Sequence, residues 1–158
     1  MSRAAEQLLI RQMSAADLPR AIEIARSLKD APHWPESAWT AALNREAEPR
    51  RICLVAANPH FGIIVAFAVA GLLPPQAELE SIAVTAGHQR QGVARKLFAA
   101  LARELAAAGV GEVLLEVRAS NQAAQGFYQA LGFAKTGLRT GYYADPIEDA
   151  VLMSLRLQ

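Results

Sequence analysis

The sequence predicts one α/β domain, residues 1–158, built around a mixed and mostly antiparallel sheet, and three observations lead to this prediction. The chain is 53% hydrophobic and 20% charged, which provides enough apolar material for one packed core. In its first half, apolar runs of strand length alternate with turn signals, as in antiparallel hairpins. From residue 84 onward, strand and helix patterns alternate with short connections, which favours parallel pairing through a crossover helix.

The first elements along the chain are predicted to be a strand and two helices. Residues 8–13 have the composition of a short strand, and Ser14 and Asp17 then have the spacing of a capping box that starts a helix. The apolar residues of that helix fall on one stripe: Leu18, Ile22, Ala25 and Leu28. Residues 30–35 break the pattern with two prolines, and residues 36–43 form a second helix.

Three strands are expected next. Residues 52–56 and 63–70 are apolar, and the Asn, Pro and Gly of residues 58–62 between them indicate a hairpin turn. Pro74-Pro75 then ends the second of these strands, because proline removes a backbone donor. Residues 77–84 form the third, so this half of the chain has antiparallel character.

A helix, a strand and a second helix follow residue 84. The helix at 92–108 ends at Gly109 and places its apolar residues on one stripe. That stripe consists of Val93, Leu97, Leu101, Leu105 and Ala108. Residues 112–117 read as a short buried strand. The helix at 121–131 has asparagine as its capping residue and Gly132 after its last turn.

Charge and cysteine content exclude several classes of function. A net charge of +1 gives no global attraction for nucleic acid or a membrane surface. Cys53 is the single cysteine, which excludes an internal disulfide and indicates a reducing compartment, with this thiol as inert core. His33, His60 and His88 are scattered without metal-ligand spacing. No apolar run resembles a signal peptide or a membrane span, so we expect a cytoplasmic protein without a metal.

Polar and basic residues cluster where the helix at 92–108 begins. The first turn of a helix carries partial positive charge and N–H groups without intrahelical partners, so it suits a phosphate. Gly92 and the small Ala94 let a diphosphate approach these groups, and Arg90 and Arg95 add charged contacts. The chain has neither a P-loop nor the G-x-G-x-x-G pattern. Taken alone, such a short glycine motif more often marks a solvated helix start with no ligand.

Two motifs, in the right order, resemble those of the GCN5-related N-acetyltransferase (GNAT) family. The run QRQGVA at 89–94 follows an apolar strand and resembles that family's Q/R-x-x-G-x-G/A signature. Residues 115–133 resemble the N-A-x-A-x-x-x-Y-x-x-x-G-F pattern of its second half. The matching residues there are Asn121, Ala124, Tyr128, Gly132 and Phe133. Three segments are further similar to the RimI-type ribosomal-protein alanine N-acetyltransferases of that family: IAV (82–84), LEVRASN (115–121) and RTGYY (139–143).

The resemblance implies the GNAT fold, in which the sheet splays between the fourth and fifth strands, and acetyl-CoA as co-substrate. The diphosphate would lie over residues 90–95, and the pantetheine would pair with residues 82–84 like an added strand. Asn121 corresponds to a further coenzyme contact, although as a helix cap it needs no functional explanation. The predicted coenzyme-binding residues are Ile82, Ala83, Val84, Arg90, Gln91, Gly92, Val93, Ala94, Arg95 and Asn121.

Glu116 is the catalytic base that the resemblance implies. A carboxylate in an otherwise apolar strand is costly unless it faces a polar cleft or has a partner. The role implied for it is to accept the proton of the attacking amine. A salt bridge with Arg118 or another basic residue is the alternative explanation. Glu78 and Glu80 are rival bases, since other branches of the superfamily take theirs from the preceding strand.

Tyr128 is the acid that the resemblance implies, the group that protonates the departing sulfur. It lies seven residues after Asn121, about two helical turns, so the two share a face of the helix. The alternative for Tyr128 is a packing role under the sheet, beside Phe127.

The acceptor implied by the resemblance is a protein N-terminal α-amine, such as that of a ribosomal protein. Arg139, Tyr142 and Tyr143 are then expected at the substrate entrance, while core or hairpin packing is equally expected of such an aromatic pair. Two other functions stay open: acetylation of a small-molecule amine or a lysine side chain, and acyl-CoA binding without catalysis. We expect a monomer or a weak dimer, with no nucleic-acid or membrane partner.

Overall fold

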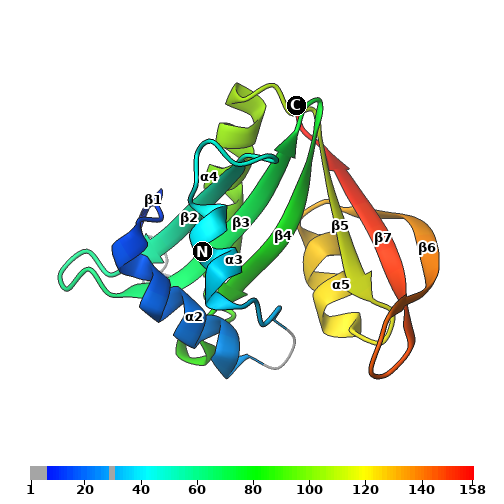
Figure 1. Cartoon of the computed structure of the whole chain (residues 1–158), viewed down its shortest axis with the longest axis horizontal. Coiled ribbons are helices and arrows are strands. Elements are labelled where there is room, and N and C mark those ends of the chain that lie inside the picture. Colours follow the sequence, from blue (N-terminus) through cyan, green and yellow to red (C-terminus); the bar gives the residue numbers. More distant parts are fainter. Residues whose placement is uncertain (1–6, 29–30) are drawn as a thin grey trace.

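A seven-stranded sheet forms the centre of the computed structural model, which describes residues 7–28 and 31–158 (Figure 1). The strands are β1 (Leu9–Gln12), β2 (Arg51–Ala57), β3 (Ile64–Leu73), β4 (Gln76–Val84), β5 (Glu112–Arg118), β6 (Ala134–Tyr143) and β7 (Glu148–Arg156). They pair in the order β1-β2-β3-β4-β5-β7-β6, and every pairing is antiparallel except that of β4 with β5. The sheet is therefore mixed and mostly antiparallel, as the sequence predicts.

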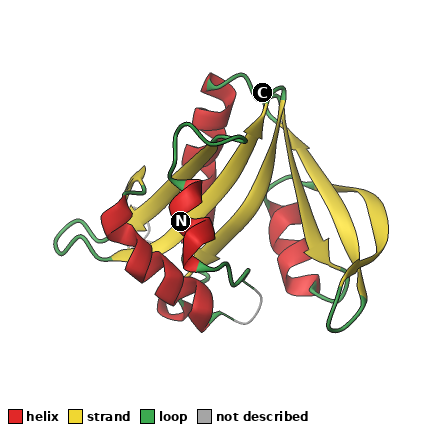
Figure 2. Cartoon of the chain, viewed as in Figure 1, coloured by secondary structure: helices red, strands yellow, loops and turns green. Residues whose placement is uncertain are grey.

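Helices cover both faces of this sheet (Figure 2). They are α2 (Leu18–Ser27), α3 (Glu36–Ala42), α4 (Val93–Ala107) and α5 (Gln122–Ala130), with short 3-10 turns η1 (Ala15–Asp17) and η2 (Ala86–His88). On the face of α2 and α3, Trp39 packs edge-on against Phe67 with ring centroids 5.1 Å apart. On the face of α4 and α5, the rings of Phe98 and Phe133 are 5.6 Å apart. Each face thus has its own apolar core.

Local capping signals mark where the helices begin. Gly92 precedes α4 in the left-handed conformation, with φ 82°. The side chain of Asn121 accepts a hydrogen bond of 3.0 Å from the N–H of Ala124 and so caps α5. At the predicted capping box, the N–H of Ser14 donates to the carboxylate of Asp17 at 2.8 Å. This box opens η1, and α2 continues from it.

The hairpin turn predicted at residues 58–62 is confirmed between β2 and β3. The side-chain oxygen of Asn58 accepts hydrogen bonds from the N–H groups of His60 and Phe61, at 2.8 and 3.2 Å. Gly62 has φ 69° and donates its N–H to the carbonyl of Asn58 at 2.8 Å. The turn is therefore held by the asparagine and glycine that predicted it.

The buried face of α2 differs from the predicted stripe. Ala21, Ile24 and Ala25 are the residues that this helix buries, whereas Leu18 and Ile22 are only half-buried. The two alanines are at most 2% exposed, which shows that the helix lies close against its neighbours. Small side chains allow that approach, and the stripe of larger residues is displaced to the rim of the contact.

Two predictions concern residues that lie partly outside the described part of the chain. The first is the break at residues 30–35, of which Asp30 is not described. Residues 31–35 form neither helix nor strand, as predicted. Residues 1–6, which bear on the expected lack of a leader, are also outside the described part. Among the helices of residues 7–28 and 31–158, none is long and apolar enough to cross a membrane.

β6 is an element that the sequence pattern does not predict. Nine of its ten residues are exposed, and its sequence AKTGLRTGYY contains two glycines and no apolar alternation. β7 lies between β5 and β6, so β6 forms an outer edge of the sheet (Figure 1). Pairing with β7 therefore defines this strand, and burial does not.

β4 and β5 separate soon after they meet (Figure 1). They pair in parallel only where residues 76–78 face residues 112–114. β4 also carries a register shift against β3, which leaves Glu80 as an extra residue between Leu79 and Ser81. A bulge of this kind bends a strand and increases its twist. The predicted splay between the fourth and fifth strands is confirmed.

Candidate active site

A cavity of about 900 Å³ lies where β4 and β5 diverge. Its wall includes residues 79–84 of β4, the start of α4, residues 116–118 of β5 and one side of α5. The predicted site residues that line it are Ile82, Ala83, Val84, Arg90, Gly92, Val93, Ala94, Glu116, Asn121, Tyr128 and Tyr143. The predicted site residues that do not line it are Gln91, Arg95, Arg139 and Tyr142. A smaller hollow of about 320 Å³, lined by residues such as Arg50 and Glu104, contains none of the predicted residues.

The edge of β4 that faces β5 is open along most of its length. Beyond Glu78, the described residues provide no strand that pairs with this edge. The side chains of Ala83 and Val84 are buried in the cores on opposite faces of the sheet. These residues therefore present mainly backbone N–H and C=O groups to the cavity. Such an edge can pair with an extended ligand that contains amides.

The turn before α4 has a backbone suited to an anion. Arg90 has φ 61° and Gly92 has φ 82°, both left-handed, and this conformation is uncommon for a residue such as arginine. Left-handed residues within a turn can direct successive N–H groups into one concave site. Gly92 provides no capping side chain, so the first turn of α4 keeps N–H groups for a ligand. Val93 is 2% exposed, so its side chain is not available to a ligand and only its backbone could bind one.

Tyr128 and Asn121 lie on the same side of α5 and both line the cavity, as the seven-residue spacing predicts. The ring of Tyr128 packs edge-on against Phe133, with centroids 5.8 Å apart. Burial raises the pKa of Tyr128 to about 12, with a smaller contribution from Tyr143. The phenol therefore keeps its proton at neutral pH and can donate it.

Glu116 lies on the face of β5 that opens to the cavity. Alternate residues of this strand point into the core: Val113, Leu115 and Val117. The cation beside Glu116 is Arg139, whose Nη1 is 3.4 Å from Oε1 of the carboxylate. The alternative partner considered from the sequence, Arg118, instead pairs with Glu148 at 3.4 Å. The carboxylate is thus held from β6 and not from its own strand.

The two rival carboxylates have different surroundings. Glu80 lines the cavity, but Nε of Arg51 contacts both of its oxygens, at 3.1 and 3.0 Å. The contact crosses Gly71, where a Cβ atom would lie 2.6 Å from Oε1 of Glu80. Glu78 keeps solvent contact and does not line the cavity, and its pKa is raised first by desolvation and then by Glu80 and Glu116. Glu116, in contrast, lines the cavity, and the distance to its cation, Arg139, is longer, at 3.4 Å.

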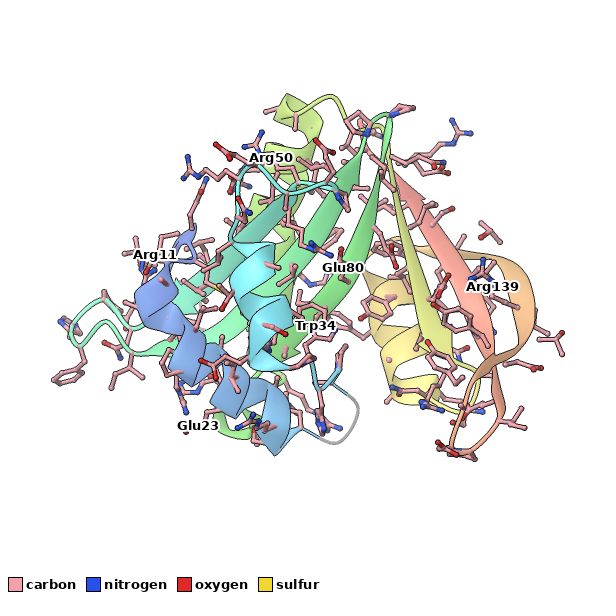
Figure 3. All side chains as sticks on the ribbon, viewed as in Figure 1. Arg11, Glu23, Trp34, Arg50, Glu80 and Arg139 are labelled. Atoms are coloured by element: carbon pink, nitrogen blue, oxygen red, sulfur yellow. The ribbon has the colours of Figure 1, made fainter. Side chains whose placement is uncertain are left out.

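Figure 3 shows Glu80 and Arg139, the residue that contacts Glu116, on opposite sides of the gap between β4 and β5. Glu80 projects from β4, and Arg139 belongs to β6 beyond β5 and β7. The cavity therefore has a carboxylate on each side: Glu80 on the β4 side and Glu116 on the β5 side.

A second charged group lies next to Tyr143 at the cavity wall. The guanidinium of Arg118 lies 4.3 Å from the centre of the Tyr143 ring. Glu148, the partner of Arg118, also accepts the N–H of Ser120 at 2.6 Å. The pKa of Glu148 is lowered, first by its hydrogen bonds with Ser120. The face of the Tyr143 ring thus packs against Arg118, which Glu148 holds, and Tyr143 lines the cavity.

Sequence reasoning missed one part of the wall. The connection between α2 and α3 lines the cavity through Leu28, Ala31, Pro32 and His33. The prolines of this segment predict only a break, and nothing in them indicates which side of the sheet the segment covers. His33 lies 3.3 Å from the carbonyl of Leu28, and His88 lies 2.9 Å from the hydroxyl of Thr85. Among the residues that the structure describes, no group of three or more His, Cys, Asp or Glu could hold a metal.

Comparison with known proteins gives concordant matches. Residues 16–133 match the acetyltransferase (GNAT) family. The chain is 37% identical over 148 residues to the ribosomal protein bS18-alanine N-acetyltransferase of Escherichia coli K12, covering 92% of this chain and 95% of that protein. It is 35% identical over 159 residues to the N-alpha-acetyltransferase RimI of Mycobacterium tuberculosis, covering 97% and 95%. The crystal structure of the Escherichia coli ribosomal-protein-S18-alanine N-acetyltransferase matches with a TM-score of 0.80 and 34% identity, covering 96% and 94%.

Proposed function

The chain belongs to the acetyltransferase (GNAT) family, and on that basis we propose that it transfers the acetyl group of acetyl-CoA to the α-amine of a protein N-terminus. One observation carries the proposal. The open edge of β4, the left-handed turn before α4, Glu116 and Tyr128 all face a single cavity. The acceptor is supported by two relatives that are named for N-terminal or alanine acetylation. We propose a ribosomal protein with an N-terminal alanine as the acceptor.

The coenzyme side of the cavity has groups that fit each part of acetyl-CoA. We propose that the diphosphate binds the N–H groups at the start of α4, with Arg90 beside them. The amides of the pantetheine would pair with the open backbone of residues 82–84. Asn121 has its side-chain oxygen engaged as a cap, so its amide nitrogen is the group that would reach the coenzyme. The bound coenzyme supplies the acetyl thioester.

The proposed chemistry forms a nitrogen–carbon bond and breaks a carbon–sulfur bond. The attacking amine must lose a proton, and the departing sulfur must gain one. Glu116 accepts the amine proton, directly or through water, and Tyr128 donates its phenolic proton to sulfur. An α-amine has an ordinary pKa near 8, against about 10.4 for lysine, so far more of it is neutral at physiological pH. A carboxylate is then a sufficient base.

A peptide experiment tests the acceptor class. The enzyme is incubated with acetyl-CoA and a peptide that begins with alanine and contains an internal lysine, and the product is mapped by mass spectrometry. We expect acetylation on the α-amine alone, and no reaction when that amine is blocked. Modification confined to lysine, or to free small amines, would assign the enzyme to one of those acceptors instead. Binding of acetyl-CoA without any release of free thiol would indicate a non-catalytic module.

A pair of variants tests the base. Glu116→Gln removes the negative charge, and we expect kcat to fall about 100-fold, most at low pH, where more of the amine must lose a proton. Glu112→Gln is the matched control, because it lies on the same strand, outside the cavity wall, where Gln76 donates to it at 2.7 Å. Equal activity of the two variants would remove Glu116 from the mechanism.

A further inference from the structure

The bulge in β4 lies at the point where the cavity opens. β4 pairs with β5 only through residues 76–78, and the register shift that leaves Glu80 as an extra residue follows directly. The parallel register, carried two residues further, brings Glu80 level with Glu116, and both residues line the cavity. Because a bulge bends its strand, the conformation at Glu80 sets how far β4 turns away from β5 at this level.

Arg51 holds this bulge from two strands away. It belongs to β2, and its Nε donates to both oxygens of the Glu80 carboxylate, at 3.1 and 3.0 Å. The side chains of Arg51 and Glu80 are 26% and 17% exposed, so solvent screens this ion pair less than a pair on the open surface. β2 itself is paired on both sides, with β1 and with β3. The ion pair therefore ties the extra residue of β4 to a strand that is fixed within the sheet.

Gly71 leaves the space through which this ion pair forms. It lies on β3, where it faces Arg51 on one side and Glu78 on the other. A Cβ atom at this position would lie 2.6 Å from Oε1 of Glu80, so the carboxylate occupies the space that a side chain would fill. Gly71 is not among the left-handed glycines of the described residues. Space for the carboxylate, and not backbone conformation, therefore accounts for glycine here.

The proposed binding mode of the coenzyme places the bulge next to the reacting group. With the diphosphate at the start of α4 and the pantetheine along residues 82–84, the thioester lies at the end of the open edge toward Glu80. We propose that Arg51 and Gly71 are positioning residues that hold the β4 bulge, so that the acetyl group meets the acceptor amine beside Glu116. This role rests on the proposed function. Neither residue lines the cavity, so both act through Glu80.

Three variants disturb this arrangement in different ways. Arg51→Gln removes the cation, and Glu80→Gln removes the negative charge of its partner. Gly71→Ala leaves both charges in place, but its methyl group would lie 2.6 Å from Oε1 and displace the end of a flexible side chain. Arg50→Gln is the matched control, because it removes an exposed arginine beside Arg51 that lines the same smaller hollow, away from the cavity.

Single turnovers with saturating acetyl-CoA and an alanine-initiated peptide measure the chemical step. We expect Arg51→Gln and Gly71→Ala to lower this rate about ten- to 100-fold, since a displacement of about 1 Å near the reacting atoms can cost that much. Calorimetry should show acetyl-CoA affinity changed by less than about threefold, because the proposed contacts at residues 82–84 and at the start of α4 remain. Arg50→Gln should match the wild type in both measurements.

A double variant separates positioning from a general effect on stability. In Arg51→Gln combined with Glu80→Gln, the two amides can still form a hydrogen bond without charge. We expect this double variant to be at least as active as Arg51→Gln alone, whereas two independent losses would multiply. Thermal denaturation of each variant checks that the rates belong to folded enzyme.

Three outcomes would overturn the proposal. Wild-type single-turnover rates in folded Arg51→Gln and Gly71→Ala would show that the bulge needs neither residue. A loss confined to Glu80→Gln would show that Glu80 acts on the substrates itself. Weaker acetyl-CoA binding with an unchanged rate at saturation would assign the bulge to coenzyme affinity. Failure of the proposed function is recognised separately, because the wild-type enzyme would then not acetylate the α-amine of the peptide.

Discussion

Replacing Tyr128 by phenylalanine removes one hydroxyl group from the cavity and leaves the ring. The ring packs edge-on against Phe133 at 5.8 Å and tilted against Phe127 at 5.3 Å, and phenylalanine can keep both contacts. We therefore expect the free energy of unfolding to change by less than about 1.5 kcal/mol, as in other shape-conserving substitutions. Any large loss of activity would then belong to the hydroxyl.

The size of that loss is set by the proton affinity of the phenol. Burial raises the pKa of Tyr128 to about 12, so at pH 7 only about one phenol in 10⁵ is ionised. The ordinary pKa of a cysteine thiol, about 8.5, represents the leaving sulfur, and full proton transfer to it is uphill by roughly 3.5 units, or about 5 kcal/mol. In the proposed mechanism, Tyr128 would therefore donate to the sulfur while the carbon–sulfur bond breaks and not before. We expect Tyr128→Phe to lower kcat about 100-fold, near the lower end of general acid catalysis.

The assay for Tyr128→Phe is a single turnover with saturating acetyl-CoA and peptide, so that product release does not mask the chemical step. Calorimetry of acetyl-CoA binding should give an affinity close to that of the wild type, because the lost interaction belongs to the transition state. Thermal denaturation checks the fold. A single-turnover rate equal to that of the wild type would refute the reasoning and leave Tyr128 with a packing role alone.

Two further predictions concern the coenzyme site and stability. Gly92→Asn keeps the left-handed backbone at φ 82°, which asparagine tolerates, but places a side chain at the start of α4. Calorimetry should show acetyl-CoA binding at least about tenfold weaker in Gly92→Asn with a nearly unchanged melting temperature, and unchanged affinity would exclude the phosphate site. Arg11 donates hydrogen bonds of 2.7 and 2.8 Å to the carboxylate of Asp17 and lowers its pKa to about 2. The charged carboxylate therefore stabilises the fold at pH values above its ordinary pKa near 3.8, and this stabilisation is lost as the pH falls toward 2. Asp17→Asn should then lower the free energy of unfolding by about 1–2 kcal/mol at pH 7 and reduce the decline of stability between pH 4 and 2. An unchanged decline in denaturant titrations would contradict this account.

Much of the fold follows from signals that act within a few residues. Asn121 caps α5 through a bond to the third residue after it, and the turn at 58–62 is closed by its own asparagine and glycine. Gly92 is a third local signal, because its left-handed backbone conformation lies directly at the start of α4. The sequence by itself therefore determines the elements around the part of the cavity that we propose binds the coenzyme, together with the family to which the chain belongs.

The surroundings of Glu116, on the side of the cavity that we propose for the acceptor, were decided only by tertiary structure. The alternative considered from the sequence was a salt bridge of Glu116 with Arg118, two residues away, or with another basic residue, but Glu148 of β7 holds Arg118. Arg139 reaches Glu116 instead, because β7 pairs with β5 and β6 follows at the edge, with a bulge that depends on Asp149. The two ion pairs join residues 23 and 30 positions apart that carry no shared spacing. Strand order and register, which arise from packing of the whole sheet, bring them together.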